Sequence, residues 1–184
     1  MSENTSTRIL ALDLSLTSSG WCWCDDTDEL VTGTLNPGDR KGARRMGWLR
    51  DRVLHLVDES AAGLVAIEGF SFGSKGRAVV DIGGLGWVVR TALWDANVPY
   101  VEVAPSLIKK FATGKGNAPK ELVRDAARDR FVLRPGISGD ECDAIWLWAL
   151  VASACGVATV KVPKVNREAV SKVSSLLEVA ADAA

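Results

Sequence analysis

Histidine, tyrosine and methionine are scarce in this 184-residue chain, which has one, one and two of them, and its charges almost cancel. With 22 basic and 23 acidic residues there is no global electrostatic argument for nucleic-acid binding, so any such argument rests on local clusters. The longest apolar stretch, residues 144–152, is too short to span a bilayer, and the N-terminus has no apolar signal-peptide core. We therefore expect a cytoplasmic protein.

Cysteine is also scarce, and its spacing does not match a metal site. Cys22 and Cys24 form a C-x-C pair, but no second cysteine or histidine pair completes a zinc pattern. We expect Cys142 and Cys155 to be free thiols as well, in a reducing compartment. The single histidine, His55, lies in an arginine-rich segment and is expected at the surface.

Hydrophobic residues make up 47% of the chain, and seven tryptophans are available for burial. This is enough for one sizeable core, so we predict one domain over residues 8–160. Residues 1–7 are expected to be disordered, and residues 161–184 to form a C-terminal helical tail. The sequence has no internal repeat and no linker long enough to divide it.

Apolar patterning predicts three strands, a helix, a strand, a helix, a strand and then helices. Ser138 and Glu141 have the spacing of a capping box and mark the start of a helix near Asp140. This order suits an α/β fold, a mixed five-stranded sheet with helices on both faces. The expected strands are residues 8–14, 21–24, 30–35, 64–67 and 99–103, and the other helices are residues 42–60, 78–96, 105–111 and 119–130 with a helical tail from 163.

The expected helix at residues 78–96 contains Gly83, Gly84 and Gly86, which lower its intrinsic stability. Such a helix indicates close packing, either against the helix of a second subunit or against the sheet. The apolar contacts expected for a second subunit are Leu85, Val88, Val89 and Leu93.

Two apolar strands end in carboxylates, Asp13 in L-A-L-D-L-S and Glu68 in V-A-I-E-G. An unpaired charge there is costly unless it reaches a cleft, a cation or a salt-bridge partner. Asp140 and Asp143 are three residues apart and share one face of a helix's first turns, where they can share a metal ion or complement the macrodipole. Two-metal phosphodiester cleavage needs such oxygen ligands from separate elements.

Basic residues gather in two segments, each of which is either a solvated helix face or a phosphate track. The first segment holds Arg40, Lys41, Arg44, Arg45, Arg50 and Arg52, and the second holds Lys109, Lys110, Lys115, Lys120 and Arg124.

Four blocks in this order resemble the RuvC family of Holliday junction resolvases, which have the RNase H-like fold of the retroviral-integrase superfamily. The resemblance covers most of residues 8–155. The first block alone is weak, because actin-like and sugar-kinase folds also begin with an aspartate strand and a glycine turn, whereas the third is more specific. The blocks are D-L-S-L-T-S-S-G, I-E-G, A-P-S-L-I-K-K-F-A-T-G-K-G-N-A-P-K-E-L-V and D-E-C-D-A-I-W-L.

The resemblance implies a metal-dependent endonuclease of recombination and repair, a homodimer that cleaves four-way junctions or other branched DNA. Its products would carry 5′-phosphate and 3′-hydroxyl ends. It implies two Mg²⁺ ions per site, with Mn²⁺ as a substitute, and places Lys109 near the active site or a phosphate, with Lys120 beyond the glycine loop. The implied catalytic and metal-binding residues are Asp13, Glu68, Asp140 and Asp143.

After Glu68 the chain departs from the bacterial family, because Ser71 stands where a junction-probing aromatic is expected. Phe70 or Phe72 can stack on an unpaired base or pack in the core. The sequence resembles the shorter, divergent phage-type members, so a phage-encoded protein would act in the host cytoplasm. Further DNA contacts expected in this loop are Phe72, Lys75 and Arg77.

Two other function classes fit parts of the sequence. A non-catalytic protein that binds DNA structures would share the fold and the basic residues. A phosphotransferase of the actin and sugar-kinase superfold would share the first strand, but it usually needs two such domains to enclose ATP, and no second phosphate loop is visible.

Overall fold

The computed structural model describes residues 7–70, 77–158 and 160–182. Five strands form one sheet in the order β3-β2-β1-β4-β5, in which β1, β2 and β3 are antiparallel neighbours and β4 and β5 continue parallel to β1. The predicted mixed five-stranded sheet is therefore confirmed. The strands are β1 (Ile9–Asp13), β2 (Ser19–Cys24), β3 (Leu30–Leu35), β4 (Leu64–Glu68) and β5 (Tyr100–Val103).

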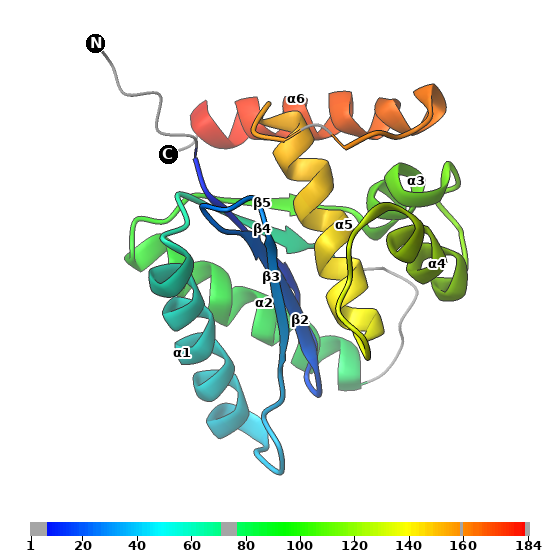
Figure 1. Cartoon of the computed structure of the whole chain (residues 1–184). Coiled ribbons are helices and arrows are strands. Elements are labelled where there is room, and N and C mark those ends of the chain that lie inside the picture. The colour runs from blue at the N-terminus through cyan, green and yellow to red at the C-terminus, as the bar shows by residue number, and fades with distance from the viewer. Residues whose placement is uncertain (1–6, 71–76, 159, 183–184) are drawn as a thin grey trace.

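Helices cover both faces of the sheet (Figure 1), as the sequence predicted. α1 and α2 lie on one face; α5 crosses the other, with α3, α4 and α6 packed around it. No helix among the described residues combines the length and apolar character needed to cross a membrane. The helices are α1 (Gly42–Ser60), α2 (Arg77–Asp95), α3 (Pro105–Thr113), α4 (Lys120–Arg130), α5 (Gly139–Ala154), the short 3-10 helix η1 (Lys164–Arg167) and α6 (Glu168–Asp182).

The alternation of side chains along β1 decides where its terminal carboxylate points. Leu10 and Leu12 belong to the core under α1 and α2, whereas Ile9 and Ala11 belong to the core under α5. Successive side chains of a strand point to opposite faces. Asp13 therefore lies on the α5 face of the sheet.

The same alternation places the carboxylate of β4. Leu64 and Ala66 pack in the core under α5, so Glu68 also lies on that face. Leu12 is the register partner of Ile67 in the parallel pair of β1 and β4, which brings Asp13 and Glu68 to neighbouring strand ends. The chain thus presents two carboxylates side by side beneath the start of α5.

α5 is the central helix of the fold and is buried on every side from Ala144 to Ala152. The Trp146 ring makes edge-on contacts with Phe111 and Phe131, and its Nε1 donates a hydrogen bond of 3.0 Å to the Val123 carbonyl. Buried tryptophans usually need such a polar partner. A helix enclosed in this way holds the residues of its first turn at a fixed position relative to the sheet.

α2 packs on the sheet of its own chain, which corrects part of the expectation from its sequence. Leu85, Val89 and Leu93 are buried in the core with α1 and the sheet, so they are not available to a second subunit. A side chain at Gly86 would overlap the Phe70 ring. The glycine at this position is therefore explained by packing within the chain.

Gly20 of β2 allows the start of α5 to lie directly on the sheet. It is the register partner of Asp13, and a Cβ at this position would overlap the carbonyl group of Asp140. No side chain fits between the two backbones. The distance between the carboxylates of β1 and those of α5 therefore depends on this glycine.

We expect Gly20→Ala to destabilise the protein by about 1–3 kcal/mol, because an inserted methyl group must push the first turn of α5 away from β2. Gly47→Ala is the matched control. Gly47 lies within α1 with open space around its Cβ position among the described residues, and the exchange should stabilise the helix by up to about 1 kcal/mol. Urea unfolding of both variants measures the difference; equal stability would show that α5 does not rest on Gly20.

Candidate active site

Four carboxylates approach one another on the α5 face of the sheet. Asp13 and Glu68 come from the ends of β1 and β4, and Asp140 and Asp143 come from the first turns of α5. They lie close enough for the charges of Asp140 and Asp143 to raise the pKa of Asp13. The structure therefore brings together the four acidic residues that the sequence singled out.

Burial dominates the ionisation of the two strand carboxylates. Burial first and neighbouring carboxylates second raise the pKa of Asp13 to about 7 and that of Glu68 to about 8. The pKa of Asp143 is raised by burial and by Asp140, although Lys120 opposes the change. A cluster of this kind favours either protons or a cation.

Two lysines supply positive charge beside this cluster. Nζ of Lys120, at the start of α4, lies 3.9 Å from Oδ2 of Asp143. Lys109, in α3, is near enough to lower the pKa of Glu68 against the effect of burial. Lys109 and Lys120, which the family resemblance assigned to this region, therefore both lie beside the carboxylates.

Glu141 has a different position from its acidic neighbours and fixes the start of α5. It forms the predicted capping box with Ser138, and its carboxylate accepts hydrogen bonds from Thr32 Oγ1 at 2.9 Å and from Arg134 Nη2 at 2.6 Å. Burial raises the pKa of Glu141, but these hydrogen bonds outweigh burial and hold it below its usual range. Glu141 thus joins the helix start to β3 and to the loop before α5.

The loop after β4 falls only partly within the described structure. Phe72 and Lys75 lie outside the described residues, and so does the side chain of Arg77. Phe70 packs against Gly86, and the Arg90 guanidinium lies 5.8 Å from the centre of its ring. Phe70 is therefore held against α2.

The donor set suits a hard divalent cation, because carboxylate oxygens are the ligands that Mg²⁺ and Mn²⁺ prefer. As the described side chains stand, however, no three acidic, cysteine or histidine residues are close enough together to enclose an ion. Burial and neighbouring carboxylates raise the pKa values of Asp13 and Glu68, so a cation that binds there competes with their protons.

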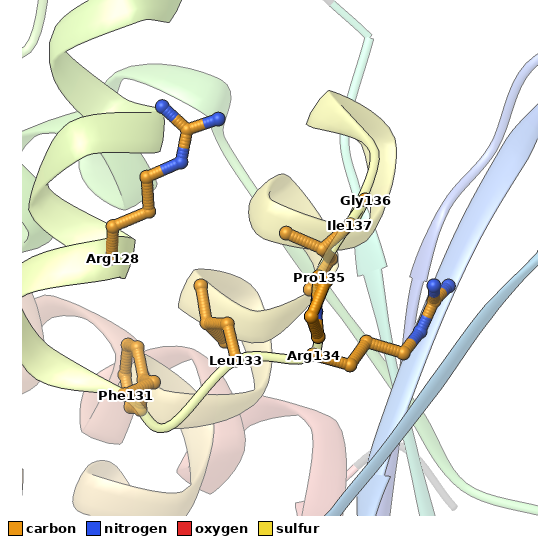
Figure 2. A pocket seen from close by; sticks show the side chains of 7 residues that line it. All are labelled: Arg128, Phe131, Leu133, Arg134, Pro135, Gly136 and Ile137. Atoms are coloured by element: carbon orange, nitrogen blue, oxygen red, sulfur yellow. The ribbon is translucent and has the colours of Figure 1, made fainter.

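A cavity of about 260 Å³ lies beside the loop before α5 (Figure 2). None of the four acidic residues lines it, so the candidate active site is at the ends of β1 and β4 and not in this cavity. The lining residues are Arg128, Phe131, Leu133, Arg134, Pro135, Gly136 and Ile137.

Two features of the site were not identified from the sequence. In the sequence, Gly20 is only the last residue of the block D-L-S-L-T-S-S-G, and Arg124 is only one member of the second basic segment. Arg124 lies four residues after Lys120, a spacing that places both on one face of α4, and its guanidinium reaches Gly139 at the start of α5. The helical spacing was therefore the available signal for Arg124, whereas no local signal marks Gly20.

Sequence comparisons connect this arrangement to known proteins. The profile of the family described as Crossover junction endodeoxyribonuclease RuvC matches residues 9–150. A relative of that name from Anaeromyxobacter dehalogenans (strain 2CP-C) is 32% identical over 114 residues, which are 62% of this chain and 61% of the relative. Another from Halorhodospira halophila is 32% identical over 143 residues, which are 76% of this chain and 86% of that relative. The match thus spans 61% of the length of the first relative.

Solved structures share the fold. Thermus thermophilus RuvC in complex with Holliday junction substrate has a TM-score of 0.64 and 21% identity, covering 84% of this chain and 99% of that one. The yeast mitochondrial Holliday junction resolvase Ydc2 has a TM-score of 0.55 and 10% identity, covering 97% and 85%. The predicted RNase H-like fold is confirmed, and the family depends on divalent metal ions. With a family profile that matches from β1 to α5, this chain belongs to the RuvC family.

Proposed function

We propose that the protein is a metal-dependent endonuclease that cleaves four-way DNA junctions or related branched DNA. The observation that carries the proposal is the meeting of four carboxylates, from two strand ends and one helix start, in a chain of the RuvC family. The catalytic and metal-binding residues of the proposal are Asp13, Glu68, Asp140 and Asp143.

In the proposed reaction, water adds to phosphorus as the bond from phosphorus to the 3′ oxygen breaks, which leaves 5′-phosphate and 3′-hydroxyl ends. Two Mg²⁺ ions, or Mn²⁺ in their place, would activate the water and stabilise the leaving oxygen. As proposed ligands, Asp13 and Glu68 are carried by the ends of β1 and β4, and Asp140 and Asp143 by the buried helix α5. In this proposal Lys109 and Lys120 bind the phosphate that enters beside the carboxylates, which their positions near Glu68 and Asp143 support.

Contacts with the junction centre are assigned to the loop after β4. Phe70 is engaged with Gly86 and Arg90, so Phe72 is the phenylalanine of this loop that we assign to stacking on an unpaired base. Lys75 and Arg77 would bind neighbouring phosphates. The tetrad of four acids favours an active nuclease over a protein that binds junctions without cutting them.

A homodimer fits the same proposal and involves the exposed face of α2. Val80, Trp87 and Trp94 are spaced seven residues apart and are 74%, 63% and 66% exposed. Large apolar side chains in such a row mark contact surfaces, and a seven-residue repeat is the seam of paired helices. Gly84 has open space around its Cβ position among the described residues, which leaves room for a partner backbone. Val88 is half-buried beside this row.

Two-fold symmetry connects the dimer with the substrate. A four-way junction presents two opposed strands, and a two-fold dimer can place one active site on each. The buried residues Leu85, Val89 and Leu93 then hold α2 on the sheet, while its opposite face binds the second copy.

We predict that the wild-type protein cleaves an immobile four-way junction with Mg²⁺ and not with chelator, more readily than a Y-fork, a flap or a linear duplex. Asp143→Asn should abolish cleavage but retain junction binding, because the amide removes a metal-binding charge with little change of shape. Gel assays of binding and of product ends measure both.

Asp58→Asn is the matched control, because Asp58 is exposed at the end of α1. It should bind and cut as the wild type does. Junction cleavage by Asp143→Asn at the wild-type rate would contradict the carboxylate assignment, and a wild-type protein that binds junctions without cutting them would indicate the non-catalytic class.

The raised pKa values of Asp13 and Glu68 predict that the metal-free protein becomes less stable as the pH rises. The native state holds these protons more tightly than the unfolded state, so stability falls as pH rises from about 4 towards the raised pKa values of about 7 and about 8. Glu68→Gln should raise the metal-free Tm at pH 8.5 by about 2–8 °C, for a gain of about 1–2 kcal/mol, and by less at pH 5.

Glu178→Gln, an exposed exchange in α6, should leave the Tm unchanged at both pH values. Mg²⁺ should raise the Tm of the wild type at pH 8.5 more than that of Glu68→Gln. A Glu68→Gln protein that is less stable than the wild type at pH 8.5 without metal would contradict this prediction. It would show that burial and neighbouring carboxylates do not destabilise the charged form of Glu68.

The dimer proposal predicts that Gly84→Leu weakens self-association without destabilising the folded chain, because the monomer has room for the side chain and a partner helix does not. Sedimentation should show a wild-type dimer and a variant shifted towards monomer, with double nicking reduced more than single nicking. Gly47→Leu, at an equally open position of α1, should remain dimeric. A wild type that is monomeric both free and on junction DNA rules out this interface.

A further inference from the structure

α4 carries a row of basic residues that begins at the candidate active site. Lys120, Arg124 and Arg128 follow one another at intervals of four residues, so they lie along one side of the helix. Lys120, the first of them, lies 3.9 Å from Asp143. The row therefore leads away from the carboxylates along α4.

Arg124 is held over the start of α5. A Cβ at Gly139 would lie 2.5 Å from its Nη2, so the guanidinium occupies the space that a side chain at Gly139 would need. Nε of Arg124 is buried without a hydrogen-bond partner among the described residues. Arg124 therefore places a positive charge beside Gly139, the residue before Asp140. No described carboxylate lies within salt-bridge distance of this charge.

Arg128 continues the row into solvent. Its side chain is 56% exposed, and its only described ion pair is with Asp125 at 3.2 Å, an exposed contact that contributes little and is easily exchanged. Figure 2 shows Arg128 at the wall of the cavity with its guanidinium directed away from Arg134, whose own guanidinium binds Glu141. Arg128 is thus open to an anion from solution, whereas Arg134 is engaged within the fold.

The acidic residues of α4 lie beside this row, and among the described residues Asp125 alone of them forms an ion pair with it. Glu121, Asp125 and Asp129 each follow a basic residue by one position, which turns them about 100° around the helix. They form a separate exposed stripe. The side of α4 nearest the start of α5 is therefore basic.

We propose that Arg124 and Arg128 extend the active site as a phosphate track, in which Lys120, Arg124 and Arg128 bind successive phosphates of one DNA strand. Four residues of α-helix rise roughly 6 Å, close to the separation of neighbouring phosphates in a strand. The track rests on the proposed function, since the same strand would enter the carboxylate site. It gives the strand a direction along α4 towards the cavity.

The test is the salt dependence of junction binding by the full-length protein in chelator. A plot of log affinity against log salt has a negative slope, and each lost phosphate contact makes this slope less steep by about 0.7–0.9. We expect Arg124→Ala and Arg128→Ala each to make the slope less steep by about this amount. The double variant should make it less steep by about twice as much. Arg124→Lys retains the charge and should keep the wild-type slope.

Lys172→Ala is the charge-matched control. Lys172 is exposed on α6, which packs across the far end of α5 from Asp140 and Asp143 (Figure 1), and α5 is roughly 24 Å long. Its slope should equal that of the wild type. Because Arg128 is exposed, Arg128→Ala tests the track even where Arg124→Ala fails to fold.

The outcomes separate the track from the proposed function. A wild type that binds and cuts junctions, with unchanged slopes in both alanine variants, overturns the track alone. A slope lowered equally by Lys172→Ala also overturns it, because the effect would then reflect net charge. A wild type that neither binds nor cuts branched DNA overturns the proposed function and the track together.

Discussion

Direct contact between the backbones of β2 and α5 is the constraint on which the candidate site depends. At Gly20 no side chain separates the strand from the carbonyl group of Asp140. Asp13 is the register partner of Gly20, so the strand carboxylate and the helix carboxylates meet across this one contact. The buried body of α5 and the hydrogen bonds of Glu141 then keep the helix start in place.

In this arrangement, the packing of the strands brings like charges to a buried position, which is electrostatically unfavourable. Apolar strands carry Asp13 and Glu68 to a position where burial and neighbouring acids both raise their pKa values. A fold selected for stability alone would place apolar or hydrogen-bonded groups there. Glu141 shows the contrast within one helix turn, because its carboxylate is buried but fully engaged by hydrogen bonds. Among the described residues, the four acids of the site have no hydrogen-bond partner of this kind, and Asp143 alone of them forms an ion pair, with Lys120.

Much of this could be predicted from the sequence, because local signals carry it. Strand ends at Asp13 and Glu68, the capping box of Ser138 and Glu141, and the order of elements all follow from short-range patterns. Contacts between distant segments could not be predicted in the same way. Gly20 touches a residue 120 positions later, and the apolar face of α2 that meets the sheet is distinguished from its exposed face only by the fold.

Glycines stand on both sides of the first turn of α5, with Gly20 beneath it and Gly139 under the Arg124 guanidinium. On the Gly20 side the backbone of the helix lies directly on the strand, because no side chain separates them. Sensitivity to mutation is consequently not confined to the residues with reactive groups. A single methyl group at Gly20 would meet backbone atoms of Asp140 and change the spacing between acids that are themselves unchanged, whereas one at Gly139 would meet only the flexible end of Arg124. The geometry of the site is therefore encoded partly by the side chain that Gly20 lacks.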